Sequence, residues 1–558
     1  MNEAAMNEAR RRPTPPAPAE LAVIALVALA TYAHLFGIRT LDPGNVAWML
    51  HGDPAQHYLG WQFFRHEAWA WPPGRIAGFG LPDGTSIVFS DTIPLLALAL
   101  KPFSALLPDE FQYFGPWMLL CFVLNGYFGL RLLTRISSDR LLRVLGALLF
   151  IFSPPLFMRA YGHEALMAHW LLLASMDTYL GGWRFGRWSL WLLLAALIHP
   201  YLLLMTLGLF AAAAYKAAGM ENSLHRRVLL AQCVLAGLLL VGVMWACGYF
   251  TSKGNLSGGG YGFFSMNLLA LIEPVFIGPE FGSSPFLASH ATATAGQYEG
   301  YLYLGAGGLF LAVVALALRL QGPPQPGLAP QGLPPRAQLA PLCLVAFAFW
   351  LLALSNSVTF AGHHLFTVPL PDVVLKALSV FRASGRFGWP AFYLITFAII
   401  ALILPRLSRP AAFAILAAGL LLQIADHTHK YREFRHAIRE RGKWSTPLQD
   451  PRWHDFAAAA QQLVLIPPHP VMETIYLPFA HLAAAHRLAT NAAHTARADA
   501  DRRGSHGAQS AAELAGGHHD PRVLYVMVQP EAVERLPRAL QTRLVTLDGY
   551  RVLPPVAP

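Results

Sequence analysis

One acidic residue stands where chemistry at a membrane surface would need it. Asp53, in Gly52-Asp53-Pro54, lies shortly after the first apolar run, and Trp69 and Trp71 follow in the same segment. Tryptophan favours the membrane interface. A carboxylate in this place can take a proton from the hydroxyl of a water-soluble acceptor while a lipid headgroup lies beside it. The pattern also fits an ordinary turn with a solvated carboxylate, so Asp53 is either a general base or a turn residue.

Further polar residues follow Asp53 in the same segment. His57 is a candidate substrate contact, and Asp83, in Pro82-Asp83-Gly84, has the pattern of a turn residue. Asp91 either caps a helix that begins at Thr92 or lies beside Asp53 in a common site. Capping is the simpler interpretation of Asp91.

Tyrosines flank one acid in a later segment, Tyr298-Glu299-Gly300-Tyr301, which leads into an apolar run. Aromatic residues at the mouth of a helix usually mark the membrane interface. Aromatic faces beside a carboxylate also suit a sugar ring. Tyr298 and Glu299 are therefore candidate substrate contacts as well as candidate interface residues.

Two arginines lie four residues apart in a third polar segment. Arg382 and Arg386 are placed on the outer side of the predicted membrane, where positive charge is disfavoured. The arginine side chain binds phosphate through a rigid fork of donors. The pair therefore indicates a lipid-linked phosphate or diphosphate, with ordinary lipid headgroups as the alternative partner.

Ionisable residues near the ends of apolar runs are functional candidates by default. Arg159, His163, Glu164 and His169 fall in such places. None of them has the spacing of a metal site. His163 is a candidate substrate contact.

The composition of the chain indicates a membrane protein. Of the 558 residues, 55% are hydrophobic and 13% are charged, which exceeds the apolar content of an ordinary globular domain. The apolar residues fall into runs of about 17 to 25 residues, enough to cross about 30 Å of hydrocarbon as a helix. The net charge of +10 comes from short basic clusters between the runs. Membrane orientation explains these clusters, so no nucleic-acid partner is expected.

The pattern predicts an all-α polytopic membrane protein. Residues 1–20 form a cytoplasmic tail, residues 21–426 form the membrane region, and long outer loops cover 37–112, 251–300 and 355–387. The proline-broken stretch Ile93–Leu107 is interfacial or re-entrant. About eleven transmembrane helices are expected: Leu21–Phe36, Pro116–Leu133, Val144–Leu156, Ala165–Leu180, two within Trp188–Ala214 that meet outside at His199-Pro200, Val228–Tyr249, Leu302–Leu318, Leu339–Ala353, Phe392–Leu404 and Ala411–Ile424.

Residues 427–558 are predicted to form a small soluble α/β domain on the periplasmic side. Asp548-Gly549 is a strong hairpin signal. Ala493–His519 is expected to be a mobile loop. The predicted strands are Leu463–Ile466, Val523–Val528 and Leu544–Leu547, the last followed by Tyr550–Leu553 across the turn, and the predicted helix is Pro530–Gln541.

The early acid, the long first loop and the outer C-terminal domain resemble the GT-C superfamily of membrane glycosyltransferases. Three segments resemble an uncharacterised bacterial branch of it: Gly52-Asp53 to Leu81-Pro82-Asp83-Gly84, Tyr298-Glu299-Gly300-Tyr301, and Arg382 to Phe387. The likeness covers most of the membrane region. Many members carry paired acids in the first loop, whereas proline follows Asp53 here.

This resemblance implies an enzyme that moves a sugar from a polyprenyl-phosphate carrier, with inversion, to a periplasmic glycan, lipid or protein. Asp53 matches the position of the catalytic carboxylate, and Arg382 and Arg386 would stabilise the departing phosphate. Some members use a divalent cation such as Mg or Mn, which Asp91 would help to hold. Membrane lipids and the lipid-linked donor are the expected partners, in a role in the cell envelope.

Two other classes of function remain open from the sequence. A transporter or flippase for a lipid-linked or envelope glycan would place ionisable residues near the middle of the bilayer and show repeat symmetry. Here the polar residues gather in the outer segments and no repeat is visible, which favours an enzyme. A non-catalytic assembly protein would use its C-terminal domain to bind a partner.

Overall fold

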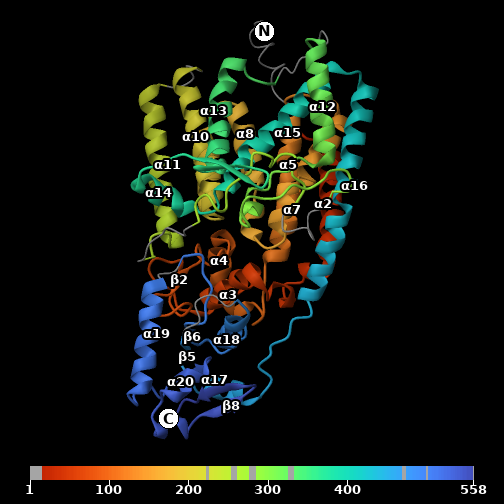
Figure 1. Ribbon diagram of the computed structural model, residues 1–558. Helices are drawn as coiled ribbons and strands as arrows, with labels where there is room; N and C mark the ends of the chain where they lie inside the picture. Colours follow the sequence, from red (N-terminus) through yellow and green to blue (C-terminus); the bar gives the residue numbers. More distant parts are fainter. Residues whose placement is uncertain are drawn as a thin grey trace.

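The protein is a helical bundle with a small sheet-containing domain at one end (Figure 1). The tail predicted at residues 1–20 lies largely outside the described part of the chain. The computed structural model describes residues 15–220, 225–252, 260–275, 284–324, 332–467, 473–497 and 500–556.

Seven helices of the described chain are long and apolar enough to cross a membrane by length and composition. Six lie in the range of 19 to 23 residues, and α16 has 33. A helix forms all the hydrogen bonds of its backbone polar groups internally, so it can cross the hydrocarbon core of a membrane. They are α2 (Pro18–Phe36), α5 (Phe114–Leu133), α10 (Pro200–Gly219), α11 (Arg226–Cys247), α13 (Arg336–Leu354), α15 (Trp389–Ile403, within the span Ser384–Arg406) and α16 (Arg409–Arg441).

Each of the eleven predicted apolar runs contains a helix, but four of these are short or bent. The α6 and α7 helices make a pair bent by 44° and count as an eighth candidate span. The other three fall below the length of a full span, so the number of crossings stays a prediction. The four cases are α6 (Arg140–Ile151) with α7 (Pro154–Ala160), α8 (Trp170–Leu180), α9 (Phe185–Ala196) and α12 (Gly305–Gln321).

Short basic loops mark one end of the bundle. Arg143 pairs with Glu20 at 2.9 Å, and Arg409 pairs with Asp139. The start of α2, the loop before α6 and the start of α16 therefore share one end, as the charge pattern predicts. The break at Pro200 is also confirmed, because proline occupies the first turn of α10 and His199 ends the preceding stretch.

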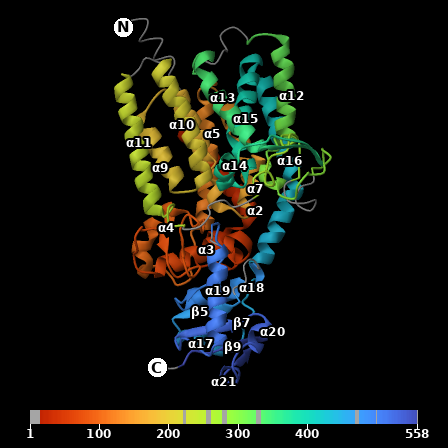
Figure 2. The ribbon, with the colours of Figure 1, turned by 60° about the vertical axis from the view of Figure 1, so that its left-hand side comes forward.

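The long loops gather at the other end (Figures 1 and 2). The first carries α3 (Gly52–His66), the short pair β1 (Arg75–Ile76) and β2 (Thr85–Ser86), and α4 (Pro94–Leu100) with η3 (Lys101–Leu106). The Ile93–Leu107 stretch lies beside α3 at this end. The other loops carry η6 (Gln297–Gly300), then β3 (Ser357–Phe360), β4 (His363–Thr367), α14 (Asp372–Leu378), η7 (Ser379–Phe381) and η8 (Ser384–Gly388).

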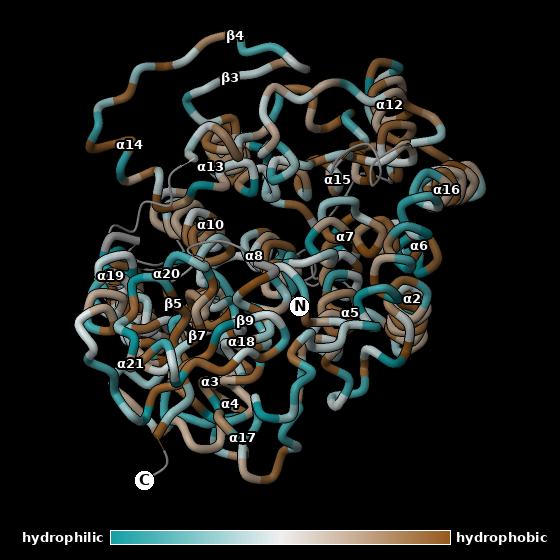
Figure 3. Tube along the Cα trace, turned by 60° about the horizontal axis from the view of Figure 1, so that its bottom comes forward, coloured by the Kyte–Doolittle hydropathy of each residue, from teal (hydrophilic) through white to brown (hydrophobic). Residues whose placement is uncertain are grey.

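Hydropathy separates the two parts of the molecule. Viewed from the loop end, apolar colour runs along the bundle helices, whereas the tail domain mixes polar and apolar residues (Figure 3). The hairpin of β3 and β4 with α14 runs outside the bundle in the same view. α16 extends from the bundle to the tail domain, and the predicted boundary at residue 427 therefore falls inside this helix. At about 1.5 Å per residue, 33 residues reach about 50 Å, which is longer than a bilayer core.

The tail domain is a five-stranded mixed sheet in the order β6-β5-β7-β9-β8. Alternate residues of β5 face opposite sides: Leu463 and Leu465 pack with α17 and α18, and Val464 and Ile466 pack with α19. Both faces are therefore covered. The elements are α17 (Arg452–Ala458), β5 (Gln462–Ile466), α18 (Glu473–Ala485), β6 (Ala489–Thr490), α19 (Ala500–Ala515), β7 (Val523–Met527), α20 (Pro530–Glu534), α21 (Arg538–Gln541), β8 (Val545–Leu547) and β9 (Tyr550–Leu553).

The hairpin at Asp548-Gly549 is confirmed, with positive φ values of 44° and 86° at the two turn residues. Two predictions in this domain are wrong. The helix expected over Pro530–Gln541 is divided into α20 and α21, because Pro537 cannot continue the ladder of helical hydrogen bonds. The loop expected over Ala493–His519 contains the helix α19, whose alanines favour the helical state.

Candidate active site

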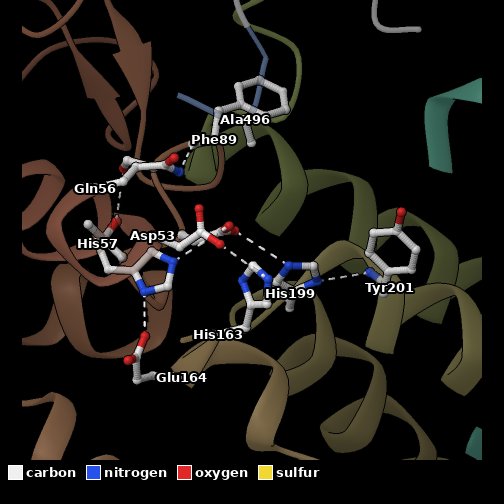
Figure 4. Close-up of polar contacts among 12 residues, drawn as sticks. Asp53, Gln56, His57, Phe89, His163, Glu164, His199, Tyr201 and Ala496 are labelled. Carbon is white, nitrogen blue, oxygen red and sulfur yellow. Dashed lines mark hydrogen bonds and ion pairs between the residues drawn. The ribbon is translucent and has the colours of Figure 1, made fainter. Parts of the chain in front are cut away.

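Asp53 lies in the first turn of α3 at the loop end of the bundle. The backbone enters the helix through Gly52, whose φ of 45° suits glycine. The helix N-terminus favours a negative charge at this position. The Asp53 side chain is 39% exposed, and its Oδ2 lies 3.3 Å from Nε2 of His163 (Figure 4). An accessible carboxylate therefore stands beside an imidazole contributed by the segment after α7.

His163 links Asp53 to a buried ionic cluster. Its Nε2 also lies 3.9 Å from Oε1 of Glu299. Burial and the nearby charges of Arg386 and Arg159 hold the pKa of His163 well below its ordinary value, and Glu299 offsets only part of this effect. His163 is therefore a neutral imidazole at neutral pH, able to hydrogen-bond Asp53 without neutralising it.

Glu299 is the centre of that cluster. Arg386 approaches it with Nε at 2.8 Å and Nη2 at 2.6 Å, and Nη1 of Arg159 lies 2.8 Å from the same carboxylate. Burial alone would raise the pKa of Glu299, but the two arginines hold it well below the ordinary value. Both carboxylate oxygens are occupied, so the expected sugar contact by Glu299 is not what the structure places there.

The same geometry corrects the prediction for Arg386. Arg386 was predicted to bind an anion from outside the protein. Its guanidinium instead binds the carboxylate of Glu299 within the protein. Its guanidinium also lies over the ring of Tyr201 at 4.8 Å. Arg382 differs, because it is exposed and lies over Phe264 at 5.0 Å. Of the predicted pair, Arg382 is the residue directed to the surface.

A second group of residues surrounds Asp91. Its carboxylate lies 3.4 Å from Nε2 of His199 and 3.9 Å from Nε2 of His57. The capping interpretation is wrong, because Ile93 stands at the N-terminus of α4 and no side chain caps that helix. Burial lowers the pKa of His199 to about 4, despite the opposing charge of Asp91. The alternative, that Asp91 lies beside Asp53 in a common site, stays a prediction; the charges of both acids act on His57.

His57 is buried between two acids and does not reach the surface. Nδ1 of His57 lies 2.6 Å from Oε2 of Glu164, and the side chain is 1% exposed. Burial disfavours its charged form, but Glu164 in direct contact, with Asp91 and Asp53 nearby, raises its pKa above the ordinary value. His57 therefore lies against Glu164 in the interior (Figure 4), and its burial does not support the predicted substrate contact.

Tyr298 lies on the border between the ionic cluster and a polar cavity. The cavity has a volume of about 520 Å³. Its polar lining includes Asn267, Glu273, His290, Gln297, Tyr298 and Tyr301. The predicted role of Tyr298 in contacting a substrate stays a prediction, and the cavity gives a hydroxyl-rich group room beside it.

Several residues of the site had no role assigned from the sequence. In the sequence, His199 only marked the break between two predicted helices. Glu164 was one of several ionisable residues near the ends of apolar runs. Gln56 donates a hydrogen bond of 3.2 Å to the carbonyl of Phe89, and Ala496 of the tail domain donates one of 2.8 Å to the same oxygen (Figure 4). No sequence signal connects residue 496 with residue 89, because the contact is set by domain docking.

The described residues contain no group of three or more His, Cys, Asp or Glu arranged to hold a metal ion. Asp53 lies beside His163, and Asp91 lies between His199 and His57. These residues do not fit a metal site as they stand. Asp91 as a ligand of Mg or Mn therefore stays a prediction, and no step is derived through a metal.

Fold and site define a multi-pass helical membrane protein with a soluble α/β tail. The chain belongs to the family described as "Domain of unknown function (DUF6311)", whose model matches residues 25–428. A second model, "DUF6311 C-terminal domain", matches residues 452–555. The tail domain of the family thus begins after the end of α16.

No curated protein matches the chain. Among solved structures, the chain is similar to an archaeal oligosaccharyltransferase, AglB from Archaeoglobus fulgidus, in complex with an inhibitory peptide and a dolichol-phosphate. The two share 11% identity over 91% of this chain and 69% of that chain, with a TM-score of 0.41. At this TM-score the likeness carries no argument about activity.

Proposed function

We propose that the protein is a GT-C-type glycosyltransferase of a bacterial inner membrane. It moves a sugar from a polyprenyl-phosphate-linked donor to an acceptor on the periplasmic side. The observation that carries the proposal is Asp53, an accessible carboxylate held 3.3 Å from a neutral histidine at the loop end of the bundle. An accessible carboxylate beside an imidazole is a candidate general base.

In the proposed reaction, Asp53 accepts the proton of the acceptor hydroxyl. The acceptor oxygen then forms a bond to the anomeric carbon of the sugar from the face opposite the phosphate. The bond between that carbon and the phosphate oxygen breaks, and its electron pair leaves with the polyprenyl phosphate. The exposed guanidinium of Arg382 stabilises the negative charge that develops there.

The other charged residues act through Asp53 and its surroundings. His163 fixes the orientation of the Asp53 carboxylate, and burial together with the charges of Arg386 and Arg159 keeps His163 neutral. His57 holds Asp91 and Glu164 close to one another without direct charge repulsion. These buried contacts support preorganisation, since groups fixed before the reaction need no rearrangement during it.

The proposal is tested by the surface glycans of a deletion strain that carries either the wild-type gene or Asp53→Asn. At equal abundance in the membrane, the asparagine variant lowers formation of the affected glycan by about 100-fold or more, because a general base contributes at least that much. Asp42→Asn is the matched control. Asp42 is an exposed acid in the same outer loop, and its side chain accepts a hydrogen bond of 3.0 Å from the backbone amide of Gly44.

Full restoration of the glycan by Asp53→Asn would overturn the catalytic role of Asp53. A flippase or an assembly protein would then be the better interpretation. Loss of the glycan in both variants would instead show that the loop tolerates no change of charge, and would contradict a specific role for Asp53.

A further inference from the structure

The tail domain pairs with the first outer loop through its backbone. Thr490 of β6 donates a hydrogen bond of 2.8 Å to the carbonyl of Gly78. Its own carbonyl accepts from the amides of Gly80 and Leu81 at 2.9 and 3.0 Å. Thr490 is fully buried. Backbone pairing of this kind fixes the register between the two parts.

Side chains strengthen the same docking. Arg502 pairs with Asp83 at 2.9 Å. Arg503 lies so close to Gly80 that a Cβ added there would meet its Nη2 at 2.6 Å. Gly80 also has a φ of 93°, which other residues rarely adopt. The tail domain is therefore seated on the first loop in one defined position.

The segment after β6 continues from this contact into the candidate active site. The amide of Ala496 donates to the carbonyl of Phe89, two residues before Asp91. Nη2 of the next residue, Arg497, donates a hydrogen bond of 2.6 Å to the carbonyl of Val380 in η7. Residues 496 and 497 thus connect the first outer loop with the third, just before Arg382.

The position of Arg497 brings another positive charge to the site. Burial lowers the pKa of Arg497, and the charges of Tyr201, Arg382, Asp91 and Arg386 all act on it. Arg386 already has Glu299 as its partner. The guanidinium of Arg497 is held at Val380, two residues before Arg382 in the chain, and the charge of Arg382 acts on it. Like charges held together by the fold favour an anion beside them.

We propose that Arg497 of the tail domain and Arg382 of the bundle together bind the phosphate group of a polyprenyl-phosphate lipid. The tail domain is then a part of the donor site and not a separate binding module. This inference rests on the proposed function and names a second residue for its donor. Arginine suits the role because its planar fork matches the oxygen atoms of a phosphate.

The test measures binding of undecaprenyl phosphate to the purified full-length protein in detergent. Arg497→Gln is the informative variant, because its amide can still donate to the carbonyl of Val380 while the charge is lost. Its Kd rises by about tenfold, the loss expected for one charge-assisted contact. Arg382→Gln gives a similar rise. Arg522→Gln is the control, since Arg522 pairs with Asp520 at 3.0 Å on the exposed face of the same domain.

An unchanged Kd for Arg497→Gln, with a raised Kd for Arg382→Gln, would overturn the inference and leave Arg497 as a docking residue only. If neither variant changes the Kd, the phosphate is not bound at this place and the donor site of the proposed function also fails. Displacement of the probe by an excess of phosphatidylglycerol vesicles would assign the arginines to ordinary headgroups and overturn the inference too. Equal melting temperatures show that the variants remain folded.

Discussion

At the scale of single residues, the site depends on histidines whose pKa values differ. His163 is neutral because burial and two arginines oppose its protonation. Burial disfavours the charged form of His57, but Glu164 at 2.6 Å and two more acids nearby raise its pKa above the ordinary value. The surroundings therefore move the pKa values of the two histidines in opposite directions.

The raised pKa of His57 predicts a dependence of stability on pH. A histidine whose pKa is higher in the folded state stabilises the fold fully below its unfolded pKa of about 6.5 and loses this effect as the pH rises through the folded value. We expect the difference in unfolding free energy between wild type and His57→Gln to shrink from about pH 6 to about pH 9. Thermal unfolding in detergent at both pH values measures it.

Because other groups titrate over the same range, only the difference between the two proteins is informative. A difference that grows with pH would show that His57 is buried neutral and would contradict its raised pKa.

At the scale of elements, Glu299 fastens three parts of the chain together. It lies in η6, and its two arginine partners lie in α7 and η8. No local pattern in the sequence predicts this contact, because Glu299 and Arg386 are 87 residues apart. The sequence did indicate that Arg386 needed a partner, since positive charge is disfavoured on the outer side of a membrane. The sequence could not predict that Glu299 and Arg386 would pair with each other.

Glu299→Gln leaves two buried guanidinium groups without their anion. We expect it to lower the unfolding free energy by about 3 to 5 kcal/mol, the usual cost of removing one partner from a buried ion pair. The melting temperature of the protein in detergent measures the loss. Glu110→Gln is the control, because Glu110 is 59% exposed and its replacement costs about 1 kcal/mol or less. Equal melting temperatures for the two variants would contradict the buried cluster.

The helices were the most predictable elements. Each of the eleven apolar runs is helical, since length and composition alone determine whether a run can stand in hydrocarbon. The hairpin at Asp548-Gly549 was predictable because the turn itself requires those residues. The helix α19 was missed, because small and polar residues such as those of Ala500–Ala515 occur in loops as often as in helices.

At the scale of the whole molecule, the first long loop and the tail domain share one end (Figure 2). The tail domain pairs with the first loop through Thr490 and reaches the third loop through Arg497. The tail domain therefore lies against one side of the candidate site, although it is more than 400 residues from Asp53 in sequence. The position of Asp53 was predictable from the sequence, whereas the contribution of the tail domain depends on docking that no motif encodes.

The measurement that tests the proposed transfer most directly is the amount of sugar-charged polyprenyl phosphate in cells, determined by mass spectrometry of extracted lipids. Cells that carry Asp53→Asn in place of the wild-type protein accumulate the sugar-linked lipid, because the donor is made but its sugar is not transferred. Cells that carry Asp42→Asn do not. A level of sugar-linked lipid equal to that of wild-type cells, in the presence of a stable Asp53→Asn protein, would contradict the assignment of Asp53 as the catalytic base.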